Sequence, residues 1–209
     1  MSVTIKTSEE IVKLRKCGKV LARLLRHLKE NTKPGISTGE IDSMAHDYIL
    51  SNGCDPVLLN YQPYGANYPY PATLCISLND EIVHGIPSDN RIIQNGDIVS
   101  YDCTIGYEGM ITDSAISFAV GELSEDELQL LDVTKAALKE GIKAAQPGKY
   151  ISDISKAIEQ SIPKKYGITK IFSGHGVGYK VHEEPYIPNY YDGVKGVKLK
   201  PGMVLAIEP

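Results

Sequence analysis

The sequence predicts an α/β (α+β) fold that is built from two related halves. Helical patterns and then strand-like patterns fill the first 120 residues, and the same order returns after residue 124. Short segments also recur at a similar offset: Pro34-Gly35 before Ile41 and Pro147-Gly148 before Ile154, and GDIVSYD at 96–102 and GMVLAIE at 202–208. Because both kinds of segment recur, the pattern indicates an internal duplication.

The first half opens with two predicted helices. One apolar stripe with helical spacing covers residues 8–31 and consists of Ile11, Leu14, Leu21, Leu24, Leu25 and Leu28. Pro34-Gly35 ends this helix, and a capping box at residues 37–40 starts a second helix that runs to about residue 52. Residues 54–120 are rich in Tyr, Ile and Val and contain many Pro and Gly, which predicts strands and turns.

The second half repeats this order. Ser124 with Glu127 reads as another capping box, which starts a helix that ends near Ala145. A further helix is predicted over about residues 152–161, and strand and loop signals dominate from Gly167 onward. Each half therefore carries two helices followed by strands.

Composition narrows the classes of function. The net charge is −4 and the sequence pI is about 5.7, which argues against nucleic acid as the main ligand because phosphates need a basic face. The sequence has no apolar run of the length of a membrane span, and its first residues lack the basic and apolar regions of a secretion signal. No linker divides the chain. We therefore expect residues 1–209 to form a single domain in the cytoplasm, without a nucleic-acid or membrane partner.

The four cysteines are Cys17, Cys54, Cys75 and Cys103, and no two of them are spaced as C-x-x-C. They lie in apolar surroundings, which favours small buried side chains in a reducing cytosol. A zinc cluster or a disulfide framework is poorly supported.

Asp102 and Asp113 are the first candidate functional pair. They frame the segment YDCTIGYEGMITD, in which Gly106 and Gly109 predict a hairpin turn that brings the two aspartates together. Neighbouring carboxylates repel each other unless a cation or a proton lies between them. Two solvated aspartates near a turn are the alternative, but Asp102 follows an apolar run, so we expect at least one of the two to lie inside.

Two histidines lie in a second segment, SGHGVGYKVHEEP at 173–185. His175 and His182 are seven residues apart among glycines and an acidic pair, in a chain with five histidines. A structural or surface role is the alternative for either histidine alone. The glycine spacing is G-x-G-x-G, so the segment does not match a dinucleotide-binding loop.

His84 and Glu208 complete the candidate set. His84 follows an apolar strand pattern, and Glu208 ends another, where we expect a carboxylate that is not solvated. Together the candidates offer oxygen and nitrogen ligands without a thiolate, a set that suits divalent manganese, iron, cobalt or zinc. Two such ions can activate one water for amide hydrolysis. The sequence contains no phosphate-binding loop of the G-x-x-x-x-G-K-[ST] type.

Four segments together resemble a known family. NDEIVHGIP, GDIVSYDCTIGYEGMITDSA, SGHGVGYKVHEEP and PGMVLAIEP are similar to the signature blocks of type I methionine aminopeptidases, and the resemblance covers essentially the whole chain. It implies a pita-bread fold with two pseudo-symmetric halves around a dinuclear metal site. It also implies removal of the initiator methionine from nascent proteins, with preference for a small second residue.

The resemblance implies a metal-binding role for four residues: Asp102, Asp113, His175 and Glu208. Asp102 is expected to chelate one ion, Asp113 to bridge both, and His175 to bind the ion that Asp102 does not chelate. Glu208 is expected to bind metal and to relay the proton of the nucleophilic water. The implied cofactor is a pair of divalent ions, with Co, Mn, Fe(II) and Zn all open.

Substrate contacts follow from the same resemblance. His84 is expected to contact the scissile region, and His182 to donate a hydrogen bond to the tetrahedral intermediate. Tyr70 and Cys75 match residues that line the methionine pocket, and Tyr61 or Tyr68 is a further candidate. The implied partners are nascent polypeptide N-termini and, transiently, the ribosome, and the implied state is a monomer.

Three departures from the family pattern stand out. The family has a fifth ligand, a glutamate well beyond Glu208, so we expect a C-terminal part of the catalytic domain to be missing. The segment 61–68 is longer than usual, and Val181 stands where the family often has a large aromatic residue. Two rival interpretations remain: a proline-directed peptidase of the prolidase or aminopeptidase P type, and a non-catalytic binding protein on the same fold.

Overall fold

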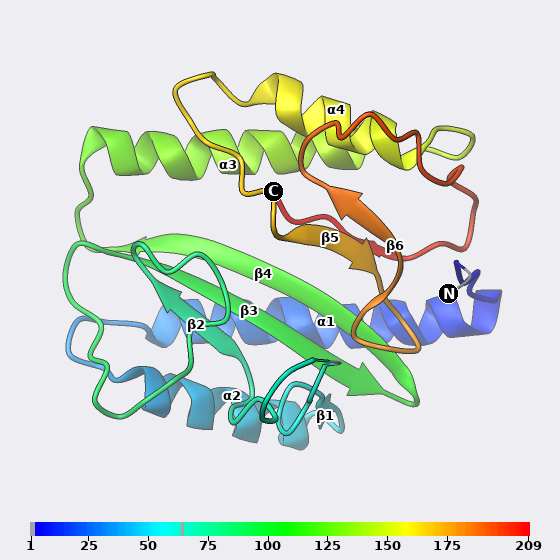
Figure 1. Ribbon diagram of the computed structural model, residues 1–209. Coiled ribbons are helices and arrows are strands. Elements are labelled where there is room, and N and C mark those ends of the chain that lie inside the picture. Colours follow the sequence, from blue (N-terminus) through cyan, green and yellow to red (C-terminus); the bar gives the residue numbers. More distant parts are fainter. Residues whose placement is uncertain (1–2, 64) are drawn as a thin grey trace. The chain divides into compact units, whose positions relative to one another are not determined.

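The computed structural model describes residues 3–63 and 65–209, and Figure 1 shows its helices and strands. The elements in chain order are α1 (Ser8–Asn31), α2 (Thr38–Ser51), β1 (Asp55–Pro56), β2 (Cys75–Leu78), β3 (Asp97–Tyr107), β4 (Met110–Val120), α3 (Glu125–Ala144), α4 (Ile151–Ser161), β5 (Ser173–Gly176), β6 (Glu183–Pro188) and β7 (Leu205–Ala206). The predicted order of helices and strands is confirmed in both halves.

The chain divides into two compact units. The first unit comprises residues 12–125, and the second comprises residues 1–11 and 126–209. The boundaries agree with the two related halves that the sequence predicts. The expectation of a single catalytic domain over residues 1–209 stays a prediction.

The first unit is a four-stranded antiparallel sheet covered by α1 and α2. Strand β3 is the central strand of this sheet. Strand β4 pairs with one edge of β3 along its whole length, and β2 and β1 pair with successive parts of the other edge of β3. Figure 1 shows α1 and α2 on the same side of the β3–β4 hairpin. The apolar stripe of α1 packs there, with Leu21, Leu24 and Leu28 fully buried, because helical spacing places them on one face.

Capping chemistry sets the start of α2. Ser37 Oγ accepts a hydrogen bond from Glu40 N at 3.1 Å, and Ser37 N donates to Glu40 Oε2 at 2.8 Å. This is the capping box that the sequence predicts, and it pairs two amides that have no partner inside the helix. The capping box predicted for Ser124 and Glu127 stays a prediction, although α3 does begin at Glu125.

The β3–β4 turn differs from the expectation in one residue. The turn consists of Glu108 and Gly109, whose φ angles are 48° and 79°, as a two-residue hairpin loop requires. Gly106 lies within β3 instead, where it pairs with Ile111. A Cβ on Gly106 would come within 3.1 Å of Val57, so close packing against the β1 region explains this glycine.

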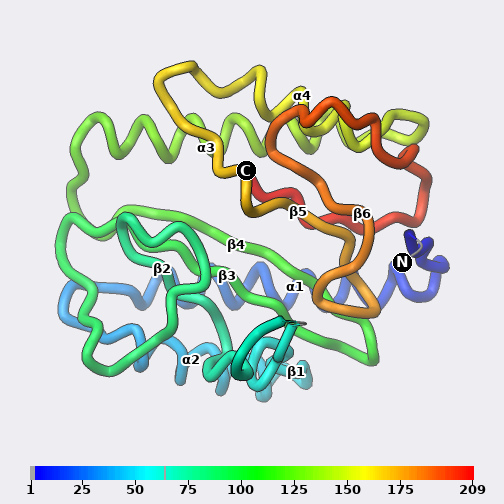
Figure 2. Tube along the Cα trace, viewed as in Figure 1, coloured from blue at the N-terminus to red at the C-terminus, as the bar shows by residue number. Residues whose placement is uncertain are grey.

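The second unit is a three-stranded antiparallel sheet in the order β6-β5-β7, with α3 and α4 beside it. Its core joins one residue of α3, three of α4, one of β6 and one of the following loop: Ala137, Ile151, Ile154, Ile158, Ile187 and Leu199. Figure 2 traces β5 and β6 as neighbouring strands joined by a short loop.

One backbone hydrogen bond recurs inside each of the two units. Gly35 N donates to Ile93 O at 2.8 Å, and Gly148 N donates to Leu199 O at 2.9 Å. Both glycines follow a proline and have a φ near +90°, a conformation that favours glycine. The recurring Pro-Gly pairs therefore build the same turn before the second helix of each unit.

The other recurring segment also repeats in structure. Gly96 and Gly202 have φ angles of 92° and 91°. Each begins a segment that enters a strand and continues to a candidate ligand, Asp102 in the first unit and Glu208 in the second. The duplication thus places one carboxylate at an equivalent point of each unit.

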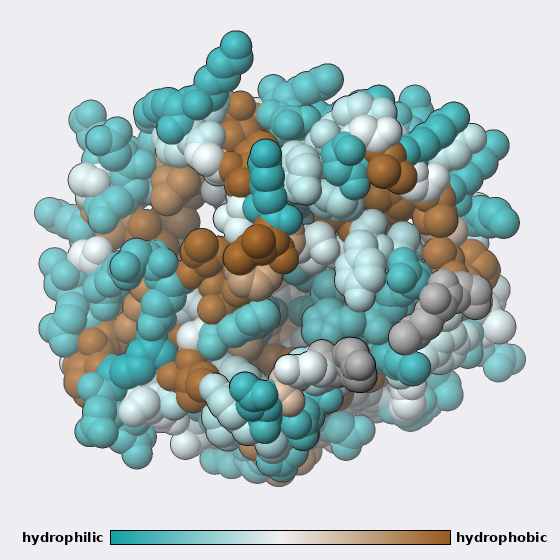
Figure 3. All heavy atoms as spheres, in the orientation of Figure 1, coloured by the Kyte–Doolittle hydropathy of each residue, from teal (hydrophilic) through white to brown (hydrophobic). Residues whose placement is uncertain are grey.

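No helix among the described residues is both long and apolar enough to cross a bilayer. Figure 3 shows hydrophilic side chains over most of one face, with hydrophobic side chains in separate spots between them.

Candidate active site

Asp102 and Asp113 lie on one face of the β3–β4 hairpin. Asp102 pairs with Ala115, and Asp113 pairs with Thr104, so the two aspartates are diagonal neighbours on adjacent strands. Diagonal neighbours on one face are within about 7–8 Å of each other, close enough to share a ligand. Both side chains are half-buried rather than fully enclosed. The predicted proximity of the two aspartates is therefore confirmed.

Cys75 lies on the same face, since it pairs with Asp102 from the other edge of β3. Burial, followed by the negative charge of Asp102, raises the pKa of the Cys75 thiol to about 12. Burial likewise raises the pKa of Cys103 well above its usual range. Both thiols therefore stay protonated at neutral pH, which argues against a role for either as a nucleophile.

Tyr70 is held against the same region. Its hydroxyl lies 3.2 Å from Leu74 O and 3.0 Å from Gly85 O, and burial raises its pKa. Tyr70 N donates to Tyr61 O at 2.8 Å, so these two tyrosines are neighbours through the backbone. Tyr68 is 64% exposed. Residue 64, inside the long segment 61–68, is outside the described residues.

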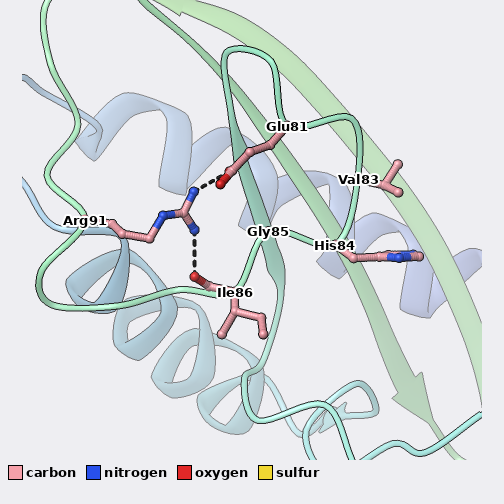
Figure 4. Close-up of a pocket in the computed structure, with 6 residues that line it drawn as sticks. All are labelled: Glu81, Val83, His84, Gly85, Ile86 and Arg91. Atoms are coloured by element: carbon pink, nitrogen blue, oxygen red, sulfur yellow. Dashed lines mark hydrogen bonds and ion pairs between the residues drawn. The ribbon is translucent and has the colours of Figure 1, made fainter. Parts of the chain in front are cut away.

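His84 lies in the loop after β2 with a φ of 60°, which is uncommon for a residue other than glycine. An open pocket of about 450 Å³ is lined by Glu81, Val83, His84, Gly85, Ile86 and Arg91. Figure 4 shows Arg91 and Glu81 pointing toward each other, while the His84 ring points away from this pair. Arg91 also donates to Ile86 O at 2.6 Å. Arg91, at the end of the loop that carries His84, therefore contacts both Glu81 at the start of that loop and Ile86 within it.

His175 and Glu208 come together in the second unit. His175 Nε2 is 3.4 Å from Glu208 Oε1, and His175 Nδ1 is 2.9 Å from Gly176 O. A hydrogen bond from Nδ1 to the carbonyl leaves the lone pair on Nε2, so that two acceptor atoms face each other. Such an arrangement needs a proton or a cation between the atoms, which fits a metal ligand pair.

The burial of Glu208 differs from the expectation. Its side chain is 45% exposed, so the prediction of a carboxylate shielded from solvent is wrong. The apolar run before it forms only the two-residue strand β7, and Glu208 lies beyond the last paired residue, Ala206. Asn189 Nδ2 donates to Glu208 O at 2.6 Å and fixes the backbone instead.

His182 is exposed, and its ring lies 4.5 Å from the His175 ring at an angle of 66°. The residues on both sides of it, Val181 and Glu183, are buried. The two predicted histidines of this segment are therefore neighbours in space, which seven residues of separation could not establish alone.

The glycines beside His175 have a structural explanation. A Cβ on Gly174 would lie 2.3 Å from Ala206 O, and one on Gly176 would lie 2.4 Å from Glu184 O. Strand β5 therefore needs glycine on both sides of His175 to fit between β6 and β7.

Several residues that shape these sites carry no motif signal. Asp42 Oδ1 accepts hydrogen bonds from Thr73 N at 2.8 Å and Leu74 N at 3.1 Å, directly before Cys75. Lys6 and Glu183 form a buried ion pair at 2.7 Å. Glu183 belongs to the histidine segment and could have been noted, whereas nothing in the local sequence marks Lys6 or Asp42.

Known proteins resemble the chain over its whole length. Residues 12–209 match metallopeptidase family M24. A methionine aminopeptidase of Aquifex aeolicus is 43% identical over 100% of this chain and 82% of its own, and methionine aminopeptidase 1 of Bacillus subtilis is 39% identical over 99% and 81%.

Solved structures agree with this similarity. The crystal structure of methionine aminopeptidase from Rickettsia prowazekii has a TM-score of 0.92 at 32% identity and covers 99% of this chain and 81% of that one. Prolidase from Pyrococcus furiosus has a TM-score of 0.79 at 27% identity, and the similarity covers 97% of this chain and 56% of the prolidase chain. The predicted α/β pita-bread fold is confirmed, and metal use follows from the family. The chain belongs to metallopeptidase family M24 and, within it, to the methionine aminopeptidases.

Proposed function

We propose that this protein is a metalloaminopeptidase that removes the initiator methionine from newly made polypeptides. The observation that carries this function is the similarity to methionine aminopeptidases at 37–43% identity over essentially the whole chain. The substrate is a peptide with a free N-terminus, and the reaction is hydrolysis of its first peptide bond.

The proposed metal ligands are Asp102, Asp113, His175 and Glu208. Carboxylate and imidazole donors suit divalent cobalt, manganese, iron or zinc. A bound pair of ions would supply a water of lowered pKa and neutralise charge on the peptide carbonyl. The facing acceptor atoms of His175 and Glu208, and the shared face of Asp102 and Asp113, support this assignment.

Three residues are proposed to handle protons and hydrogen bonds. Glu208 accepts the proton of the attacking water and passes it to the leaving amine, and its half-exposed carboxylate leaves room for this exchange. His182 donates a hydrogen bond to the oxygen of the tetrahedral intermediate, and His84 contacts the scissile region. The exposure of both histidines is compatible with contact to a substrate.

Tyr70 and Cys75 are proposed to line the pocket for the methionine side chain. Both groups are neutral at physiological pH, because burial raises the pKa of each. A neutral, polarisable surface suits an unbranched thioether. Tyr61 is a better candidate than Tyr68 for a further residue of this pocket, because Tyr61 pairs with Tyr70 through the backbone whereas Tyr68 is mostly exposed.

Cellular context remains part of the proposal. Nascent polypeptides are made in the cytoplasm, so a cytoplasmic monomer that meets them near the ribosome fits the activity. The proline-directed alternative is more distant, since the prolidase of Pyrococcus furiosus has the lower TM-score. The non-catalytic alternative predicts lost ligands, whereas the chain contains four of the five ligands that the family resemblance implies.

A peptide comparison tests the function. The manganese-loaded protein is expected to cleave Met-Gly-Met and to leave an acetylated Met-Gly-Met intact, with little action on Xaa-Pro peptides. Replacing glycine by leucine at the second position should lower kcat/KM. Faster cleavage of Xaa-Pro peptides would assign the protein to the proline-directed relatives, and no cleavage of any peptide would favour the binding protein.

A further inference from the structure

Lys6 and Glu183 form a buried ion pair inside the second unit. Lys6 Nζ is 2.7 Å from Glu183 Oε2, and the two side chains are 1% and 5% exposed. An isolated charge at such a position is costly, so each partner depends on the other to remain there. The pair connects the N-terminal segment to the residue that follows His182.

Glu183 also accepts hydrogen bonds from the loop that precedes it in the sequence. Its Oε1 accepts hydrogen bonds from Tyr179 N at 2.5 Å and Lys180 N at 3.0 Å, while Oε2 accepts one from Thr4 Oγ1. A carboxylate with this many donors has a fixed position. The loop 177–182, which joins β5 to β6 in Figure 2, is therefore tied to Glu183 at two of its amides.

Lys6 is fixed in turn by its own backbone and by the loop. Lys6 N donates to Gly202 O at 2.8 Å. Its side chain lies against Gly178, where a Cβ would come within 2.3 Å of Lys6 Cε, and its Nζ lies 4.9 Å from the centre of the Tyr179 ring. Tyr179 OH donates to Glu10 Oε2 at 2.9 Å and adds a second tie to the N-terminal segment.

The backbone on both sides of the exposed His182 is held by buried neighbours. Val181 and Glu183 on either side are buried, and the His182 ring lies 4.5 Å from that of His175. A hydrogen-bond donor must lie within a few tenths of an ångström of its required place to stabilise a transition state. The backbone position of Glu183 therefore decides where the His182 ring can reach.

We propose that Lys6 is a positioning residue that acts through Glu183 to hold His182 in place for catalysis. The proposal rests on the proposed function, because it takes His182 as the donor to the tetrahedral intermediate. Without the Lys6 charge, Glu183 would be buried and uncompensated, and the loop would shift or take up water. A lost positioning contact affects the reaction step more than the affinity for substrate.

Kinetics of the manganese-loaded protein test the proposal. Lys6→Met is expected to lower kcat on Met-Gly-Met by about 10- to 100-fold with little change in KM. In the His182→Ala background the same substitution should lower kcat no further, because the group that it positions is gone. Lys13→Met is the matched control, since Lys13 pairs at 3.5 Å with Glu108 on the surface and should leave kcat unchanged.

The double variant Lys6→Met/Glu183→Gln separates positioning from loss of folding. It leaves no uncompensated charge, and glutamine can still accept hydrogen bonds from Tyr179 N and Lys180 N. It should recover part of the kcat that Lys6→Met loses. An equal loss from Lys6→Met with and without His182, or no recovery in the double variant, would overturn the proposal.

Amide hydrogen exchange of the metal-free protein gives a readout that does not depend on activity. Lys6→Met should accelerate exchange at Tyr179 and Lys180 by about 10-fold or more and leave the amides of β3 and β4 unchanged. Unchanged exchange at both loop amides would overturn the proposal. If His182→Ala alone leaves kcat intact, the catalytic role of His182 fails, while accelerated exchange would still establish the link from Lys6 to the loop.

Discussion

Asp102 and Asp113 occupy diagonal positions on one face of the β3–β4 hairpin, with Asp102 opposite Ala115 and Asp113 opposite Thr104. They are eleven positions apart in the sequence, and the two-residue turn at Glu108 and Gly109 brings their strands side by side. Because carboxylates on one face repel each other, the arrangement is most stable with a cation between them. This geometry makes the hairpin the clearest target for a metal-binding experiment.

Asp113→Ala should remove most of the bound metal and nearly all activity, because the resemblance makes Asp113 the ligand shared by both ions. Isothermal titration of the metal-free protein with manganese would measure this, beside an assay on Met-Gly-Met. Asp126→Ala, at an exposed position on α3, is the control and should bind manganese like the wild type. Unchanged manganese stoichiometry in Asp113→Ala would contradict the assignment.

His182→Ala should keep its metal and lose turnover. Removal of one donor to a tetrahedral intermediate costs roughly 10²–10³ in kcat. Stopped-flow or steady-state assays on Met-Gly-Met, together with metal analysis, would check both quantities. His46→Ala, at a partly exposed position on α2, serves as the control. A rise in KM with unchanged kcat would instead give His182 a role in substrate binding alone.

Local chemistry predicted much of the fold. The capping box at Ser37 and Glu40, the leucine stripe of α1 and the recurring Pro-Gly turns each depend on residues close in sequence, and each is confirmed. Such features are readable because a helix start or a turn needs particular side chains at fixed spacing. The Asp102–Asp113 proximity follows from the same logic, since a short hairpin has few possible registers.

Features that depend on distant contacts were not predictable. Gly106 reads as a turn residue, but its role comes from packing against Val57. Glu208 reads as buried because the residues before it are apolar, yet its exposure depends on how short β7 is. Lys6 is one lysine among many in the sequence, and only the fold brings it to Glu183.

Asp42→Ala should destabilise the first unit and disturb the methionine pocket. The substitution leaves the amides of Thr73 and Leu74 without their acceptor, and both residues are buried. Each buried amide left unpaired costs about 1–3 kcal/mol. Urea unfolding would measure the loss, and KM for Met-Gly-Met should rise because Leu74 precedes Cys75. Asp42→Asn keeps an acceptor and should lose less.

Asp47→Ala is the matched control for Asp42, since Asp47 lies on the same helix with its side chain 88% exposed. Surface substitutions of this kind usually change stability by less than about 0.5 kcal/mol. An equal loss in the two variants would show that the contacts of Asp42 to the segment before β2 contribute nothing.

Gly174→Ala should weaken the pairing of β5 with β7 and, through Glu208, reduce metal binding. The added Cβ would lie 2.3 Å from Ala206 O, so one strand must move. Overpacking of this kind costs about 1–3 kcal/mol. Gly18→Ala in α1 is the control: no described atom lies within 4 Å of its added Cβ, and the change should stabilise the helix by about 0.5–1 kcal/mol.

The Lys6–Glu183 pair should make stability depend on pH in a defined window. Burial raises the pKa of Glu183, but the hydrogen bonds from Lys6 and the other donors outweigh burial, and the pKa lies below its ordinary value of 4.5. A lowered pKa means that the contribution of Glu183 to stability is fully present above pH 4.5 and is lost as pH falls through the lowered value.

Urea unfolding of the wild type and of Glu183→Gln between pH 7 and pH 3 would test this dependence. Glu183→Gln cannot ionise and leaves Lys6 without its counter-charge, so it should be less stable than the wild type at pH 7. The difference in unfolding free energy should stay constant down to about pH 4.5 and shrink below it, because protonation then removes the same charge from the wild type. A difference that is independent of pH over the whole range would show that the Glu183 carboxylate is not stabilised by its partners in the folded protein.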